Sequence, residues 1–164
     1  MSRWTWTLLL LWPLLWACTA GAPSYPDEPR IEYRRISSAE VQSGASDSLW
    51  ITIYFEDGDG DLGSAEFTPC VNTCDVAGCL DSTGIDVFIT DSRNECFATV
   101  LQLPNLTQDN RIDDISGEID LKVTGVNCRC IGCTRDTVIY DVQIRDRAGN
   151  FSNEVTTEAV VIEC

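Results

Sequence analysis

"SLWITIYFEDGDGDLG", residues 48–63, joins an alternating apolar run to a loop of aspartates and glycines. Successive side chains of an extended chain point to opposite faces, so residues two apart share a face. The apolar side chains that share a face here are Leu49, Ile51, Ile53 and Phe55. The stretch therefore predicts a β-strand over 47–56 with one buried face, followed directly by an acidic loop.

Six further segments have the character of strands. They are short and rich in β-branched and aromatic residues, and most of them alternate apolar with polar side chains. Their ranges are 30–37, 84–92, 96–103, 117–125, 136–146 and 154–162. No segment after the first eighteen residues sustains a helical period. Short strands separated by turn residues predict an all-β, immunoglobulin-like antiparallel sandwich over 30–164, with a barrel as the alternative.

The beginning of the chain has the layout of a secretory signal. Arg3 precedes an apolar run from Trp4 to Trp16, which is short for a membrane span. The residues Leu15 to Cys18 resemble a bacterial lipobox, whose cysteine becomes the lipidated N-terminus. The sequence thus predicts a signal peptide over 1–17, lipidation of Cys18 and a flexible tether over 18–29. An outer-membrane lipoprotein of the bacterial cell envelope is expected, and an ordinary cleaved signal is the alternative.

The amino-acid composition limits the classes of binding partner that we expect. The chain has 26 acidic and 11 basic residues, a formal net charge of −15 and no histidine. Such a surface repels nucleic acid and attracts divalent cations or basic partners. Histidine is the commonest general base, and the sequence also lacks a Gly-x-Ser-x-Gly elbow and a phosphate loop. We therefore expect a protein that is not an enzyme.

Asp57, Asp59 and Asp61 alternate with glycines in the loop after the strand 47–56. Calcium takes six to eight oxygen ligands, and carboxylates on alternate residues of a turn supply several. The spacing begins like an EF-hand loop but has Leu62 at its sixth position and Thr68 at its twelfth. A site here needs ligands from elsewhere.

The order of strands supplies candidates for those ligands. In a sandwich of this type the loop 57–83, the connection 107–114 and the turn 146–150 gather at one pole. We therefore predict a calcium site formed by Asp57, Asp59, Asp61, Asp146 and Asn150. The alternative is that the Asp-Gly pairs only form turns, and that Asp146 and Asn150 cap backbone amides around Gly149.

Eight cysteines follow Cys18, and an even number in an exported chain predicts disulfides. They are Cys70, Cys74, Cys79, Cys96, Cys128, Cys130, Cys133 and Cys164. Three lie in the loop 57–83 and five belong to the opposite pole, so complete pairing needs at least one bridge between the groups. A disulfide requires Cα atoms within about 7 Å, so this loop must fold back along the sandwich. The segment Cys128 to Cys133 also suits a metal-thiolate cluster or thiol handling.

Several motifs carry a resemblance to a known family. They are "ITIYFEDGDGDLG" (51–63), "LPNLT" (103–107), "ISGEIDL" (115–121) and "DVQIRDRAGNFSNEVTT" (141–157). Together with the lipobox, their order resembles small surface lipoproteins of Bacteroidota. That resemblance implies an immunoglobulin-like exported domain with no assigned activity. The cysteines are a departure from the family and look like added crosslinks.

These features favour a non-catalytic binding or structural module, tethered to a membrane through its N-terminal lipid and stabilised by calcium. A glycan or an envelope protein is the expected ligand. Exposed aromatic residues at the acidic pole would favour such a ligand, and Phe67 and Phe151 are the candidates near it in the sequence. The alternative is a metal-assisted hydrolase that uses loop carboxylates, with Asp57 and Asp61 or Asp113 and Asp114 as the pair.

Overall fold

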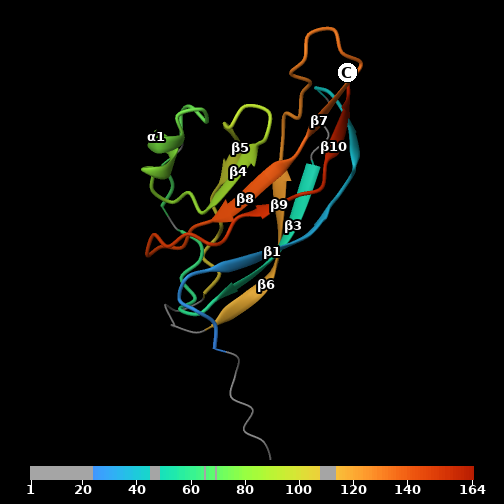
Figure 1. Ribbon diagram of the computed structural model, residues 1–164. Coiled ribbons are helices and arrows are strands. Elements are labelled where there is room, and N and C mark those ends of the chain that lie inside the picture. The colour runs from blue at the N-terminus through green and yellow to red at the C-terminus, as the bar shows by residue number, and fades with distance from the viewer. Residues whose placement is uncertain (1–23, 45–48, 65, 69, 108–113) are drawn as a thin grey trace, which may run out of the picture.

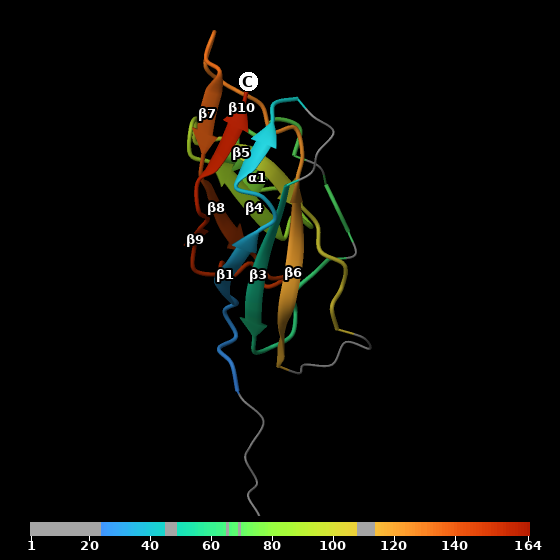
Figure 2. The same cartoon turned by 90° about the vertical axis from the view of Figure 1, so that its right-hand side faces the viewer.

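The structure is a computed structural model, and it describes residues 24–44, 49–64, 66–68, 70–107 and 114–164. The predicted signal peptide, Cys18 and the rest of the first half of the tether, residues 19–23, lie outside these residues. The described part is nearly all β, in two packed layers (Figures 1 and 2). None of its helices is long and apolar enough to cross a membrane.

One layer is a three-stranded antiparallel sheet in the order β1-β3-β6. Its strands are β1 (Arg30–Ile36), β3 (Leu49–Asp57) and β6 (Ile115–Val123). Ile53 of β3 pairs with Tyr33 on one side and Ile119 on the other. The side chains of Leu49, Ile51, Ile53 and Phe55 are all buried, which confirms the predicted inner face of this strand.

The other layer consists of two sheets that continue one another. The first has the order β5-β4-β8-β9, with β4 (Val87–Asp91), β5 (Phe97–Leu101), β8 (Tyr140–Ile144) and β9 (Val155–Thr156). The second has the order β2-β10-β7, with β2 (Glu40–Gln42), β7 (Arg135–Val138) and β10 (Val160–Glu163). All pairings are antiparallel except β2 with β10, which is parallel. The predicted all-β sandwich is confirmed.

Two predicted strands are each divided in the structure. Ile139 separates β7 from β8 because its amide donates to the hydroxyl of Ser92 (3.1 Å) and its carbonyl accepts from the Ser92 amide (3.1 Å). Thr157 lies between β9 and β10, and its hydroxyl accepts from the Tyr140 amide (3.1 Å). At these breaks a side-chain hydroxyl accepts the hydrogen bond that a backbone carbonyl of the neighbouring strand would otherwise accept. The prediction of unbroken strands over 136–146 and 154–162 was therefore wrong.

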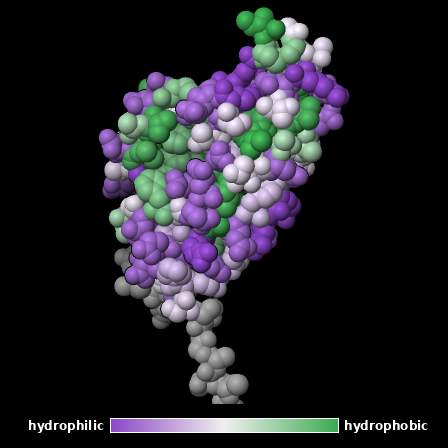
Figure 3. Space-filling model, in the orientation of Figure 1, coloured by the Kyte–Doolittle hydropathy of each residue, from purple (hydrophilic) through white to green (hydrophobic). Residues whose placement is uncertain are grey.

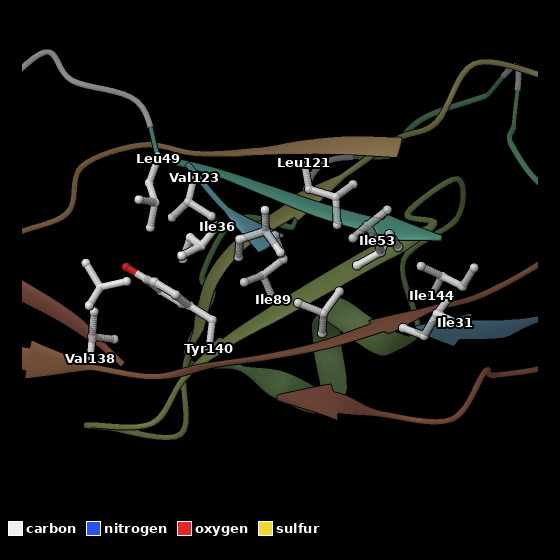
Figure 4. Packing of buried hydrophobic residues seen from close by; sticks show 14 of the residues in the cluster. Ile31, Ile36, Leu49, Ile53, Ile89, Leu121, Val123, Val138, Tyr140 and Ile144 are labelled. Carbon is white, nitrogen blue, oxygen red and sulfur yellow. The ribbon is translucent and has the colours of Figure 1, made fainter. Parts of the chain in front are cut away.

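The apolar faces of the two layers meet in one core. Figure 4 shows Leu49, Leu121 and Val123 on one side, facing Val138 and Tyr140 on the other. Fully burying an aliphatic side chain stabilises a fold by about 1.5–3 kcal/mol, so this interface dominates the favourable terms. The face of the molecule in Figure 3 is mostly hydrophilic, as expected from the charge of the chain.

The long connection between β3 and β4 folds back along the sandwich. It contains the helix α1 (Val76–Leu80), which begins after the N-cap Asp75, whose carboxylate accepts from the Gly78 amide (3.1 Å). No pattern in the sequence predicts this helix, because five residues are too few to establish a helical period. The disulfide Cys74–Cys96 ties the connection to the turn between β4 and β5. This is a bridge between the two predicted groups of cysteines, so the predicted return of the loop is confirmed.

Candidate metal centre

Four carboxylates converge at one pole of the sandwich. Asp57 is the last residue of β3, Asp59 and Asp61 follow it, and Asp146 lies just after β8. One carboxylate oxygen from each of the four lies within 4.8 Å of the others. The structure thus brings together four of the five residues that the sequence predicts as calcium ligands.

The conformation of the loop 57–63 explains how three aspartates on alternate residues face one point. Gly60 has φ = +65°, which curls the chain in a way that side chains other than glycine rarely adopt. The Gly58 amide donates to the carbonyl of Pro26 (2.9 Å), and a side chain at Gly58 would collide with the backbone of Tyr25 and Pro26. The backbone of Tyr25 and Pro26 therefore lies directly against the acidic loop.

Hydrogen bonds fix the two segments to each other. The Ala148 amide donates to one oxygen of Asp61 (3.0 Å), and the Leu62 amide donates to one oxygen of Asp57 (3.1 Å). Asn150 donates to both oxygens of Asp146, from its backbone amide (2.7 Å) and its side-chain amide (2.9 Å). Asn150 therefore orients Asp146. The capping arrangement around Gly149, which has φ = +93°, is present together with the cluster.

Three carboxylate oxygens of the cluster are buried without a hydrogen-bond partner. They are Oδ1 of Asp57, Oδ1 of Asp59 and Oδ1 of Asp61. Asp57 as a whole is fully buried. Buried polar atoms are almost always paired, and a buried acceptor without a donor costs about 1–3 kcal/mol or more when charged. Several such acceptors directed at one point are an arrangement that a cation would satisfy.

The pKa values of two of these carboxyl groups are raised, because burial and neighbouring negative charges disfavour their ionised forms. Burial, followed by the negative charge of Asp59, raises the pKa of Asp57 to about 7, against the opposing effect of the Leu62 amide. Burial, followed by the charge of Asp146, also raises the pKa of Asp61. Like charges that share a buried site destabilise each other's ionised form. A divalent ion between them would remove this repulsion.

The donor set is composed of carboxylate oxygens, which suits a hard cation such as calcium or magnesium rather than zinc. Calcium accepts irregular sets of six to eight oxygens, whereas magnesium demands a near-ideal octahedron. The cluster also differs from an EF-hand, since its fourth carboxylate comes from a distant strand end. The connection 107–114 was also predicted to lie at this pole. Its residues 108–113, which include Asp113, lie outside the described part.

A cleft of about 470 Å³ lies beside the cluster and shares Asp146 with it. Its other wall is formed by the crosslinked connection between β3 and β4. The polar side chains that line it are Ser64, Glu66, Asp81, Ser82, Thr83, Asp86, Arg145 and Arg147. Phe67, about half exposed, adjoins the cleft, because its backbone packs against Gly84 in the lining. This volume is in the range of small-ligand sites.

Asp86, the buried carboxylate of this cleft, was not among the residues predicted from the sequence. One of its oxygens accepts from the Leu103 amide (2.8 Å), and burial raises its pKa against the effect of that hydrogen bond. Asp86 falls at the start of an ordinary alternating strand, so no pattern of residues marks it. Only the return of the loop after β3 encloses it.

The eight described cysteines form four disulfides. The pairs are Cys70–Cys79, Cys74–Cys96, Cys128–Cys164 and Cys130–Cys133. Cys128, Cys133 and Cys164 lie close enough to hold a metal. In disulfide form, however, their sulfurs are not the thiolates that such a site requires.

Comparison with protein-family models, curated proteins and solved structures gives no match for this chain. The resemblance to Bacteroidota lipoproteins therefore remains a prediction from the sequence motifs.

Proposed function

We propose that this protein is a lipid-anchored, exported β-sandwich that acts as a non-catalytic binding or structural module at the bacterial cell envelope, and that it binds calcium at Asp57, Asp59, Asp61 and Asp146. The convergence of these carboxylates, with three buried oxygens that lack a donor, is the observation that carries the proposal. Asn150 serves as the positioning residue for Asp146.

In this proposal calcium fixes the shape of the acidic pole. It neutralises carboxylates that otherwise repel one another, and it joins the loop after β3 to the turn after β8. Because Asp146 also lines the neighbouring cleft, ion binding holds one wall of that cleft in place. The hydroxyls and carboxylates of the lining suit a polyhydroxylated ligand such as an envelope glycan.

The N-terminal segment gives the module an orientation. The amide of Gly58 is bonded to Pro26, so the chain leaves the fold at the acidic pole. From Cys18 to Ser24 the chain can span at most about 25 Å. A lipid on Cys18 would therefore hold the acidic pole near the membrane. The C-terminus lies at the opposite end of the molecule (Figure 1).

Hydrolysis through the same carboxylates fits the geometry less well. Glycosidases hold their two carboxyl groups about 5–5.5 Å or about 6.5–9.5 Å apart, with a sugar or water between them. The oxygens of Asp57 and Asp61 lie within 4.8 Å, and Asp57 is fully buried. A small ion fits between them better than a substrate does.

Thermal unfolding at neutral pH, with millimolar calcium or with a chelator, tests the proposal. A ligand at a hundred times its dissociation constant adds about 2.7 kcal/mol to the free energy of unfolding, a shift of several degrees. We expect that shift in the natural protein and in Asp114→Asn, an exposed carboxylate outside the cluster. We expect none in Asp61→Asn. Equal melting of the natural protein with and without calcium would reject the calcium site.

A further inference from the structure

Four cysteines gather at the pole opposite the acidic cluster. They form the disulfides Cys128–Cys164 and Cys130–Cys133, and Cys133 Sγ lies only 3.4 Å from Cys164 Sγ. The sulfurs of Cys128, Cys133 and Cys164 all lie within 4.8 Å of one another. A sulfur of one disulfide thus touches a sulfur of the other.

The backbone enforces this contact. Glu163 of β10 pairs with Arg135 of β7, and one step beyond that pair the Cys164 amide donates to the carbonyl of Thr134 (2.9 Å). The ladder therefore places Cys164 beside the end of the turn that contains Cys133. The contact follows from strand register.

Ion pairs hold the other end of the turn. The Arg129 amide donates to Asp136 (2.9 Å), and its guanidinium bonds Asp91 (3.2 Å), whose carboxylate is buried. Arg93 joins the same two carboxylates at 2.7 and 2.8 Å. The turn from Cys128 to Cys133 is thus anchored on both sides while its tip projects from the fold.

The tip is open to solvent. Ile131 is fully exposed, Cys130 and Cys164 are exposed, and the loop tip near the C-terminus forms a hydrophobic projection at the top of Figure 3. An external thiolate can therefore reach Cys130. Cys128, in contrast, packs partly against the core. The bridge Cys130–Cys133 spans only three residues, so it restrains the unfolded chain least by loop length.

We propose that these four cysteines form a thiol–disulfide exchange site whose substrates are exposed thiols, such as a small dithiol. An external thiolate attacks Cys130 Sγ, forms a mixed disulfide with it and releases the Cys133 thiolate. Cys133 then attacks Cys164 Sγ; the Cys133–Cys164 bond forms, the Cys128–Cys164 bond breaks, and Cys128 leaves as a thiolate. The second thiol of the dithiol resolves the mixed disulfide and leaves as part of an oxidised disulfide, so that Cys130 becomes a thiol.

This series of reactions transfers two electrons from the dithiol to the protein. The dithiol is oxidised to a disulfide, and the protein gains thiols at Cys128 and Cys130. The C-terminal residue stays crosslinked throughout, first to Cys128 and then to Cys133. The sheet β2-β10-β7 is therefore never released, and the site can store and return two electrons without unfolding. This activity is independent of calcium binding at the opposite pole.

A matched pair of variants tests the contact without any reductant. Cys130→Ser leaves Cys133 as a free thiol beside Cys164, whereas Cys133→Ser leaves the free thiol at Cys130, and each variant retains a bridge to Cys164. The purified variants are held near pH 8, alkylated and mapped by mass spectrometry without reduction. In Cys130→Ser we expect a Cys133–Cys164 disulfide and a Cys128 thiol in a fraction on the order of a tenth or more. In Cys133→Ser we expect the thiol at Cys130 alone.

The natural protein is then treated with about one equivalent of dithiothreitol and mapped in the same way. The expected product has thiols at Cys128 and Cys130, with Cys133–Cys164 and Cys74–Cys96 both oxidised. Thiols at Cys130 and Cys133 with an intact Cys128–Cys164 bridge would overturn the proposal, as would a Cys130→Ser variant whose only thiol is Cys133.

Discussion

At the scale of single residues, Asp57 has the most to gain from an ion. It is fully buried, one of its oxygens has no donor, and its pKa is raised to about 7 by burial and by Asp59. We predict that Asp57→Asn melts higher than the natural protein when calcium is chelated, because a buried charge is removed. The gain is about 1 kcal/mol or more.

The same variant should lose the calcium-dependent shift in melting temperature. The comparison is made by calorimetry in chelator and in millimolar calcium, with Asp114→Asn as the control. A variant that is destabilised equally in both conditions would show that Asp57 only accepts the Leu62 amide.

Asp91 differs from Asp57 in that its replacement by asparagine is expected to destabilise the fold. Burial alone would raise its pKa, but the hydrogen bonds and charge of Arg93 outweigh this and hold the pKa below its ordinary value. A carboxylate with a lowered folded pKa stabilises the fold above its unfolded pKa near 4 and loses this contribution as the pH falls through the folded value. Asp91→Asn should therefore cost about 3 kcal/mol at pH 6 and progressively less below pH 4.

Urea unfolding of the natural protein and Asp91→Asn between pH 2 and 6 measures that difference. Glu154→Gln, an exposed carboxylate, is the control and should stay near zero throughout. A destabilisation by Asp91→Asn that is the same at pH 2 and pH 6 would contradict the ion-pair explanation.

The carboxylate cluster and the ion-pair network around Asp91 differ in how far the sequence could predict them. Asp57, Asp59 and Asp61 stand together in the chain, and strand order alone suggested Asp146 as a fourth member. No sequence pattern indicated the ion-pair network, which consists of Asp91, Arg93, Arg129 and Asp136. Arg93 and Asp136 are 43 positions apart and meet only because the β4–β5 turn and the start of β7 share a pole.

At the scale of elements, the bridge Cys74–Cys96 determines where the long connection lies. It links residues 22 positions apart and holds α1 against the small cluster of Cys79, Ile85, Phe88 and Phe97. We predict that the double variant Cys74→Ser, Cys96→Ser lowers the free energy of unfolding by about 2–4 kcal/mol. Protease cleavage should also appear first within residues 66–84.

Urea unfolding and limited proteolysis provide those measurements. The double variant Cys130→Ser, Cys133→Ser is the control and should lose less stability, because its loop is much shorter. Equal losses in the two variants would mean that Cys74–Cys96 does not order the connection.

Strand positions were predictable because burial on one face imposes a period of two, as in Leu49, Ile51, Ile53 and Phe55. The breaks at Ile139 and Thr157 were not, since they depend on hydroxyls of distant residues that replace ladder partners. The strand β2 has only three residues and pairs in parallel with the end of the chain, which no local pattern reveals.

At the scale of the whole molecule, two chemically different poles are separated by one hydrophobic core. The acidic pole lies where the N-terminal segment leaves the fold, and the cysteine pole lies at the C-terminus (Figure 1). A lipid on Cys18 would place the first near the membrane and the second away from it. We predict that Cys18→Ser moves the protein from the membrane fraction to the soluble fraction.

Fractionation of cells that produce either form, followed by mass spectrometry of the N-terminal peptide, tests this arrangement. The natural protein should carry acyl chains on Cys18. Recovery of both forms in the same fraction would argue for the ordinary cleaved signal instead.

Isothermal titration of the metal-free protein with calcium at neutral pH tests most directly whether the four carboxylates bind calcium. We predict one calcium ion per chain for the natural protein and for Asp114→Asn, weaker binding of magnesium, and no binding to Asp57→Asn or Asp61→Asn. Absence of calcium binding at millimolar concentrations, or unchanged binding by the two cluster variants, would contradict the claim.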